Sequence, residues 1–117
     1  MAIHYNLAKV FQHTNSDDFL VKKEIQTFIF EIPVAIKNLI LQIRNKQYQT
    51  ALHLAQKIKP ALELMGMTIA YDEILQVEHW AIKQGKRREI EATIVSVKIH
   101  IEKAIKEMNK EYKLADC

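Results

Sequence analysis

The last third of the chain carries an apolar repeat whose spacing fits a long helix packed along other helices. Apolar side chains recur there at intervals of four and three residues: Ile90, Ile94, Val97, Ile101, Ala104 and Met108. On a helix with 3.6 residues per turn, these positions form one stripe along a single face. A long helix with one apolar stripe buries that stripe against its neighbours, so this repeat favours a helical bundle over a sheet.

Further segments show the same helical spacing, and short polar connections separate them. The predicted long helices cover about Asp17 to Asn45, Tyr48 to Leu64, Thr68 or Tyr71 up to a close at Gly85, and Lys86 to Lys113. The apolar positions expected in the first of these are Phe19 or Leu20, then Ile25, Phe28, Ile29, Ile32, Ile36, Leu39, Ile40 and Ile43. Because this period resumes directly after Pro33, we predict that the proline kinks the helix and does not end it.

A shorter apolar segment, Tyr5 to Gln12, precedes the long helices. Asn6 can cap a helix there, and Leu7, Val10 and Phe11 follow at helical spacing. This apolar face is too small to be stable alone, so we expect it to pack across one end of a bundle. The predicted fold is all-α: an antiparallel up-and-down four-helix bundle with a short N-terminal helix.

Length and composition limit the classes of function. A chain of 117 residues that is 49% hydrophobic, with two glycines and two prolines, predicts one helical domain over residues 1–117. The lysines and arginines are spread over several segments, which gives no support for a nucleic-acid partner. The start of the chain lacks the layout of a secretory signal, and polar residues interrupt the most apolar run, Ile25 to Ile43. We therefore expect a cytoplasmic protein without a membrane partner.

Metal and redox chemistry find little support in the sequence. The single cysteine, Cys117, cannot form an internal disulfide. Histidines and carboxylates do not fall at metal-binding spacings, since neighbours such as Glu78 and His79 face different ways on a helix. No metal and no cofactor are expected. The basic run from Lys83 to Arg88 is expected to be a solvated turn, with contact to an acidic partner as the alternative.

The segment from Ala55 to Gly66 carries the strongest functional signal. On a helix, Ala51, Ala55, Ile58, Leu62 and Met65 form an apolar stripe, and the positions roughly opposite are Gln49, His53, Gln56, Pro60 and Glu63. Gln56 should therefore point into water. Pro60 has no N–H for the carbonyl of Gln56, so a local bend and a freed acceptor are expected there. Gly66 should end the helix in a left-handed or closely packed position.

This segment resembles the signature of histidine phosphotransfer (HPt) domains, A-H-x-L-K-G followed six residues later by a glycine. Here it reads Ala55-Gln56-Lys57-Ile58-Lys59-Pro60, and then Gly66. The stretches that resemble the rest of the family pattern in order and spacing begin at Tyr5, Asp17, Glu31, Tyr48 and Leu75. In such domains the histidine accepts a phosphoryl group from an aspartyl phosphate on a receiver domain. Gln56 stands in its place.

A glutamine at this position changes what the resemblance implies. The lone pair of its amide nitrogen is delocalised into the carbonyl, so Gln56 cannot attack phosphorus and the chain is not expected to be an enzyme. Its side chain still matches an imidazole in length and offers a donor and an acceptor. Lys59 matches the family's lysine three residues after the acceptor, and an ordinary solvated lysine is the alternative. The predicted docking surface is formed by Gln49, Lys57, Lys59, Pro60 and Glu63.

Two of these residues depart from the family pattern. Pro60 replaces a glycine that lets the partner approach closely. Glu63 occupies a position where the family tends to carry small neutral residues, and its carboxylate would repel a phosphoryl group unless Lys59, one turn away, neutralises it. Both changes argue against phosphotransfer.

The leading hypothesis is an HPt-like module that docks on the receiver domain of a response regulator, or on a hybrid histidine kinase, without relaying phosphate. A second hypothesis keeps phosphotransfer and moves it to another residue such as His53, one turn before Gln56. A third treats the chain as a helical structural or dimerisation module. The sequence leaves these alternatives open.

Overall fold

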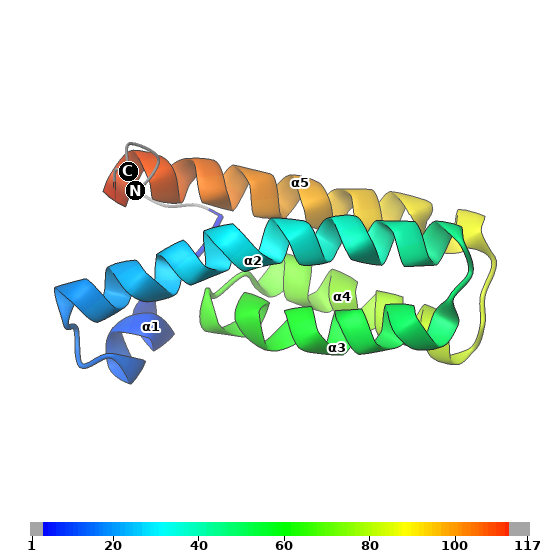
Figure 1. The fold of residues 1–117 in the computed structure, drawn as a ribbon, viewed down its shortest axis with the longest axis horizontal. Coiled ribbons are helices and arrows are strands. Elements are labelled where there is room, and N and C mark those ends of the chain that lie inside the picture. The colour runs from blue at the N-terminus through cyan, green and yellow to red at the C-terminus, as the bar shows by residue number, and fades with distance from the viewer. Residues whose placement is uncertain (1–3, 113–117) are drawn as a thin grey trace.

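The computed structural model describes residues 4–112, and every regular element in that range is a helix (Figure 1). The elements are α1 (Ala8–His13), α2 (Asp18–Arg44), α3 (Tyr48–Leu64), α4 (Thr68–Ile82) and α5 (Arg87–Tyr112). The predicted all-α fold class is confirmed. The predicted bounds of α3 are also confirmed, and α4 begins at Thr68, the earlier of the two predicted starts.

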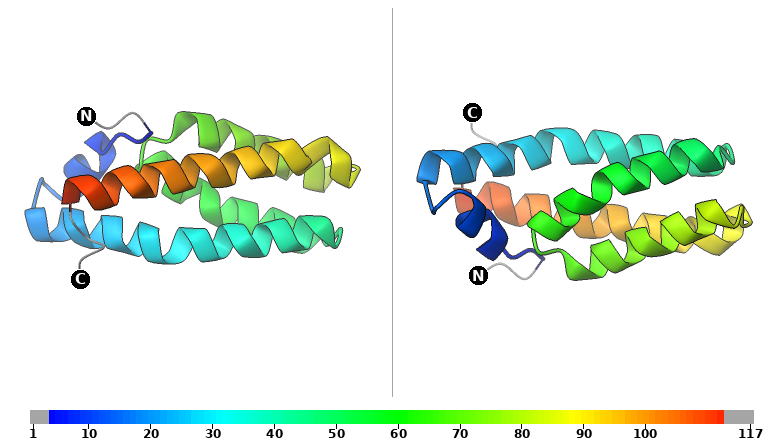
Figure 2. Two further views of the ribbon diagram at one scale, coloured as in Figure 1. Left: turned by 90° about the horizontal axis from the view of Figure 1, so that it is seen from above. Right: turned by 90° about the horizontal axis from the view of Figure 1, so that it is seen from below.

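The four long helices lie side by side along the long axis of a molecule that measures 43 × 25 × 21 Å (Figures 1 and 2). Helix α2 packs against α3 and α5, and α4 packs against the same two helices. Short turns join α2 to α3 and α4 to α5 at one end, as Figure 1 shows. Helix α1 lies at the opposite end, close to the point where α3 finishes (Figure 2).

The interior is built from the predicted apolar stripes. All six predicted positions of α5 are at most 3% exposed, and Ala51, Ala55, Ile58 and Leu62 of α3 are fully buried. In α2 the expectation for the first turn is wrong, because Phe19 and Leu20 are exposed and Val21 is buried instead. Val21 keeps the spacing of four and three residues that leads to Ile25 and Phe28, whereas Phe19 and Leu20 do not.

Helix α2 continues through Pro33, as predicted. It begins one residue later than expected because Asp17 serves as its N-cap, with the Leu20 N–H donating to Asp17 Oδ1 over 3.0 Å. A side-chain oxygen at this position satisfies an N–H that has no partner within the helix. The cap and the resumed apolar stripe together keep one continuous helix from Asp18 to Arg44.

The first helix begins at Ala8, and the predicted start at Tyr5 is wrong. Residues 4–7 instead bind other elements: the Asn6 N–H donates to Met65 O (2.8 Å), and the His4 N–H donates to Glu107 Oε1 (3.0 Å). The side chains of Tyr5 and Leu7 are buried in the core. Tertiary contacts therefore hold this segment outside the helix, and it joins the α3–α4 turn to the C-terminal part of α5.

The turns after α2, α3 and α4 share one hydrogen-bond pattern, in which a residue with positive φ follows the helix. After α3 this residue is Gly66 (φ +63°), and the Met67 N–H donates to Leu62 O over 3.0 Å. The predicted left-handed position of Gly66 is confirmed. After α2 and α4 the same place is taken by Lys46 (φ 54°) and Gln84 (φ 53°). Gly85 therefore follows the left-handed residue of its turn.

The buried Tyr5 hydroxyl gives the N-terminal segment a pH-dependent contribution to stability. Burial raises the pKa of this hydroxyl well above its ordinary value, and the nearby negative charge of Glu111 raises the pKa further. The unfolded chain releases this proton at about pH 10. Because the folded chain holds the proton to higher pH, the free energy of unfolding should fall as pH rises above about 10.

A Tyr5→Phe variant should lose less stability than the wild type between about pH 9 and about pH 11, because it lacks this proton. Urea unfolding at each pH measures the difference. Some slope should remain, since burial and the charge of Glu111 also raise the pKa of Tyr112. Parallel curves for the variant and the wild type would contradict the assignment to Tyr5.

No helix between residues 4 and 112 combines the length and the apolarity needed to cross a bilayer. The expectations that rest on Cys117, on the first three residues and on Lys113 concern positions outside the described part of the chain.

Candidate functional site

The outward face of α3 carries the residues that the sequence singled out. Gln49, His53, Gln56, Pro60 and Glu63 are all exposed, opposite the buried stripe of Ala51, Ala55, Ile58 and Leu62. Gln56 lies near the middle of the helix, and its amide makes no hydrogen bond with any residue between 4 and 112. The predicted exposure of Gln56 is therefore confirmed, and its donor and acceptor are free to meet another molecule.

Lys59 is anchored to the neighbouring helix. Its Nζ donates to Glu78 Oε1 on α4 over 3.1 Å, and the side chains of Lys59 and Glu78 are 30% and 11% exposed. The second oxygen of Glu78, Oε2, is buried without a hydrogen-bond partner among the described residues. The alternative of an ordinary solvated lysine is therefore wrong. Because Lys59 pairs with Glu78, the condition that Lys59 neutralises Glu63 is not met.

Replacing Lys59 should destabilise the protein, because the carboxylate of Glu78 would remain buried without its cation. We expect Lys59→Met to lower the free energy of unfolding by about 1–3 kcal/mol. The exposed Lys57, two residues earlier, provides a matched control, and Lys57→Met should stay within about 0.5 kcal/mol of the wild type. Urea unfolding of the two variants tests the difference, and equal stabilities would show that the ion pair contributes nothing.

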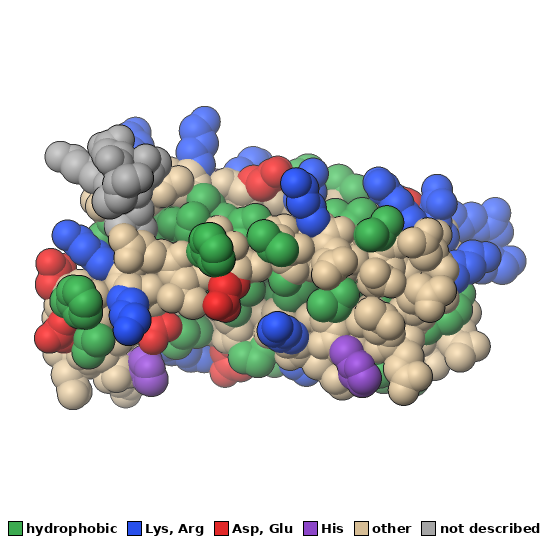
Figure 3. Space-filling model, in the orientation of Figure 1, with side chains coloured by type: hydrophobic (Ala, Val, Ile, Leu, Met, Phe, Trp, Pro, Cys, Tyr) green, Lys and Arg blue, Asp and Glu red, His purple; other side chains and the backbone are tan. Residues whose placement is uncertain are grey.

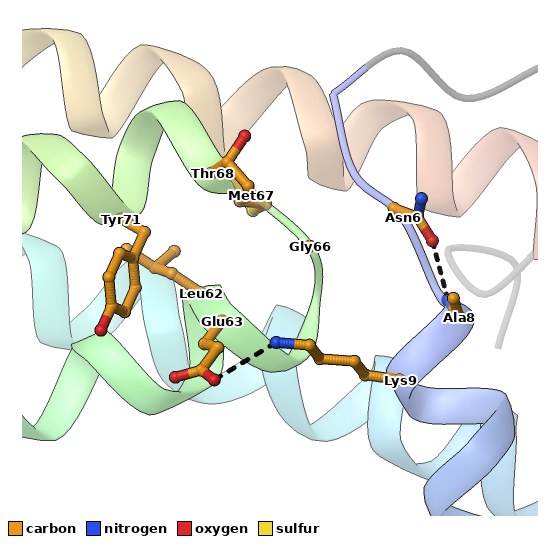
Figure 4. A pocket seen from close by; sticks show the side chains of 9 residues that line it. All are labelled: Asn6, Ala8, Lys9, Leu62, Glu63, Gly66, Met67, Thr68 and Tyr71. Atoms are coloured by element: carbon orange, nitrogen blue, oxygen red, sulfur yellow. Dashed lines mark hydrogen bonds and ion pairs between the residues drawn. The ribbon is translucent and has the colours of Figure 1, made fainter.

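Glu63 pairs with a lysine of α1. Lys9 Nζ donates to Glu63 Oε1 over 3.2 Å, and both side chains remain more than half exposed. Figure 4 shows this pair at the edge of a pocket of about 450 Å³ between α1, the end of α3 and the start of α4. Tyr71 and Thr68 line its far side. The spacing of residues along a helix could not predict this ion pair, because Lys9 and Glu63 are 54 residues apart in the sequence.

A groove of about 520 Å³ runs along the other side of the same face, between α2 and α3. Its α2 wall carries Phe30 and Val34, which are 79% and 64% exposed. Its α3 wall carries Leu54 and the exposed Lys57, which makes no ion pair with a described residue. The apolar side chains and the single cation give this groove a mixed character.

The histidines differ in their surroundings. Three of them lie close to a carboxylate of another segment: His4 with Glu107, His13 with Glu24 and His100 with Glu73. His53 is exposed and contacts no carboxylate among residues 4–112. On helix geometry it lies about 4.5 Å along the axis and about 60° around from Gln56. That offset is too large for a transfer aimed at the position of Gln56.

One end of the molecule is basic, and it holds the run from Lys83 to Arg88 that the sequence places at a turn. Figure 3 shows Lys and Arg side chains gathered at the end that holds the α2–α3 and α4–α5 turns. Arg44 of α2 and Arg87 of α5 both approach Glu91 there, over 4.0 and 3.0 Å. Trp80 is buried beneath this turn, and its Nε1–H donates to Lys86 O over 2.8 Å.

The arrangement limits the chemistry of this face. Gln56 offers polarity without a nucleophile. Within residues 4–112, no three side chains of His, Cys, Asp or Glu are grouped so that they could hold a metal ion.

The chain matches no protein-family model, no curated protein and no solved structure.

Proposed function

We propose that this protein is an HPt-like module of a two-component phosphorelay that docks on a partner without accepting phosphate. The partner would be the receiver domain of a response regulator or of a hybrid histidine kinase. The observation that carries the proposal is an exposed, unbonded amide at Gln56 in the middle of α3, where the resembling family carries its reactive imidazole.

The arrangement of the helices supports this proposal. Each of α2 to α5 packs against two of the others, and short turns join them. From these contacts we infer an antiparallel up-and-down four-helix bundle with α1 across one end, which is the architecture that the resemblance implies. In such a bundle one face of α3 stays open to solvent along its length, and a globular partner can reach Gln56.

The charges around Gln56 suit binding better than transfer. Lys59 is held by Glu78, and the carboxylate of Glu63 keeps a negative charge on the face even though Lys9 partly neutralises it. A phosphoryl group carries negative charge and would meet this carboxylate. A receiver domain without phosphate would meet a face of mixed charge, so docking is compatible with the face while phosphoryl transfer is disfavoured.

Titration of the purified chain against receiver domains from the same genome tests the proposal. We expect one or a few of them to bind, and we expect no stable phosphate on the chain after incubation with a receiver domain charged by acetyl phosphate. Phosphate on the wild-type chain would refute the loss of acceptor function. Absence of binding to every receiver domain would refute the docking role.

His53 supports a second candidate function, because it is an exposed imidazole that contacts no carboxylate among the described residues. It would act as an alternative phosphoryl acceptor with its own partner geometry. Acid-labile phosphate that disappears in a His53→Ala variant would identify this function. The same variant serves as the control in the receiver titration, where it should bind like the wild type.

A further inference from the structure

The end of the molecule that holds the α2–α3 and α4–α5 turns carries more positive charge than the chain as a whole. Residues 44–50 and 82–91 form this end, called the basic end below, and they include six cations and two carboxylates. Their excess of four positive charges compares with a net charge of +3 for the whole chain, so the remainder is close to neutral. Figure 3 shows basic side chains gathered there. All six cations are exposed: Arg44, Lys46, Lys83, Lys86, Arg87 and Arg88.

The two carboxylates of the basic end neutralise only part of this charge. Glu91 Oε1 meets Arg44 Nε at 4.0 Å and Arg87 Nε at 3.0 Å. Glu89 Oε1 accepts the Lys86 N–H over 2.7 Å, so this carboxylate is bound to the backbone at the start of α5. The cations that form no ion pair within residues 4–112 are Lys46, Lys83, Lys86 and Arg88. A partner at this end would therefore meet mainly positive charge.

Contacts between the two turns hold these cations in one patch. The Tyr48 hydroxyl donates to Gly85 O over 2.8 Å, and the ring of Tyr48 lies 5.0 Å from that of Trp80, centroid to centroid. Lys46 is two residues before Tyr48, so this hydrogen bond keeps it close to the cations on either side of Gly85. A patch that is assembled before it binds loses less conformational entropy on binding.

The other residues of the basic end favour a lipid surface over a nucleic acid. Ile82, the last residue of α4, adds an apolar side chain that is 67% exposed. Tyr48 is the single aromatic residue of this end, and because its ring packs against Trp80 it is not available to stack on a base. Lysines attract anionic headgroups without a fixed donor geometry, and an apolar side chain can enter the boundary between headgroups and acyl chains.

We propose that the basic end binds the surface of a membrane that contains anionic lipids, with the long axis of the molecule directed away from that surface. The expectation of no membrane partner rested on the absence of a secretory signal and on the interrupted apolar run, and surface binding needs neither a signal nor a spanning helix. Gln56 lies near the middle of α3, so it stays open to solvent while the basic end is bound. The proposal does not depend on the docking function of the α3 face.

Sedimentation of the purified chain with lipid vesicles tests the proposal. Vesicles of phosphatidylcholine with about one third phosphatidylserine should retain the chain at low salt, and vesicles of phosphatidylcholine alone should not. Lys46→Gln combined with Lys83→Gln should weaken this binding about tenfold, and added salt should weaken the binding of the wild type. Glutamine is compatible with the turn at position 46, because Gln84 holds the equivalent left-handed position after α4. Lys103→Gln combined with Lys106→Gln, at exposed positions in the distant half of α5, is the matched control and should bind like the wild type.

An Ile82→Ser variant separates the apolar contribution. It should weaken binding about threefold at every salt concentration, because it removes apolar contact and leaves the charge unchanged. Ile69→Ser is the matched control, since Ile69 is 64% exposed near the start of α4, at the opposite end of the same helix. Both positions are exposed, so both variants should fold.

Equal retention of the wild type on the two kinds of vesicle would overturn the proposal. An equal loss of binding in the Lys46 and Lys83 variant and in its control would do the same, because the binding would then follow total charge and not this end. An oligonucleotide duplex or single strand that binds more tightly than the anionic vesicles, and that the Lys46 and Lys83 variant no longer binds, would assign the basic end to a nucleic acid instead.

Discussion

A Gln56→His variant is expected to acquire acid-labile phosphate from a charged receiver domain, whereas the wild type acquires none. The change restores an imidazole nitrogen whose lone pair can attack phosphorus in line. Position 56 lies near the middle of α3. Gln56 is exposed there and makes no hydrogen bond to the described residues, so an imidazole ring in its place can reach a partner. The expected gain runs from no detectable phosphate to a measurable fraction of the protein.

Radiolabel retained on the chain, and its loss in acid, measure this gain. Gln56→Asn is the matched control, because it changes the side chain without adding a nucleophile. A Gln56→His variant that also carries His53→Ala should behave like Gln56→His alone. Label that depends on His53 in this pair would favour the alternative acceptor.

The residues at positions 60 and 63, Pro60 and Glu63, should limit how much phosphate the Gln56→His variant acquires. Glu63 keeps an exposed carboxylate on the same face, and Lys9 offsets only part of its charge. Adding Pro60→Gly and Glu63→Ala to Gln56→His should therefore raise the yield of phosphate further. If this triple variant stays inert while it still binds a receiver domain, the face lacks more than its histidine, and the resemblance overstates the site.

A Gly66→Ala variant should lose about 2–4 kcal/mol of stability, the largest stability effect expected for a change of one methyl group in this chain. Gly66 has a φ of +63°, which an alanine adopts only with strain. A Cβ at this position would also lie 2.5 Å from Asn6 O and 2.6 Å from Asn6 Cβ. The backbone of the N-terminal segment would have to move away.

Thermal or urea unfolding measures the loss, and Lys46→Gly is the matched control of opposite sign. Lys46 holds the equivalent left-handed position after α2 with a φ of 54°. Glycine there removes the strain of a side chain, so this variant should gain about 0.5 kcal/mol after the entropy of the unfolded chain is counted. A Gly66→Ala variant as stable as the wild type would mean that the turn can adopt another backbone conformation.

The sequence predicted the local parts of this structure well. The bounds of α3, the buried stripe of α5 and the exposure of Gln56 follow from helical spacing, because neighbours along one helix determine them. The left-handed position of Gly66 was predictable for the same reason, since it depends on the end of one helix. The prediction for the first turn of α2 was wrong. Phe19, Leu20 and Val21 are consecutive apolar residues, and Phe19 or Leu20 was predicted to be buried where the structure buries Val21.

Contacts between distant segments could not be predicted. Lys59 meets Glu78 and Lys9 meets Glu63 only because the helices fold together, and both pairs change the charge that the α3 face presents. The start of α1 was wrong for a related reason: Tyr5 is buried in the core, so helix propensity did not decide its conformation. The basic run from Lys83 to Arg88 is visible in the sequence, but the approach of Arg44 of α2 to Glu91 beside it is not.

The N-terminal segment is bonded to the end of α3, the proposed docking helix. These bonds couple α3 to the part of the chain ahead of that segment. Asn6 holds the turn at Met65 through its backbone, and three residues later Lys9 holds Glu63 through its side chain. A force or a bulky fusion applied ahead of His4 would act first on the hydrogen bonds between His4 and Glu107 on α5, then on the anchors at Asn6 and Lys9, and through these two on the exposed face of α3. Tension on the beginning of the chain would thus reach the binding surface without any change in the helices between them.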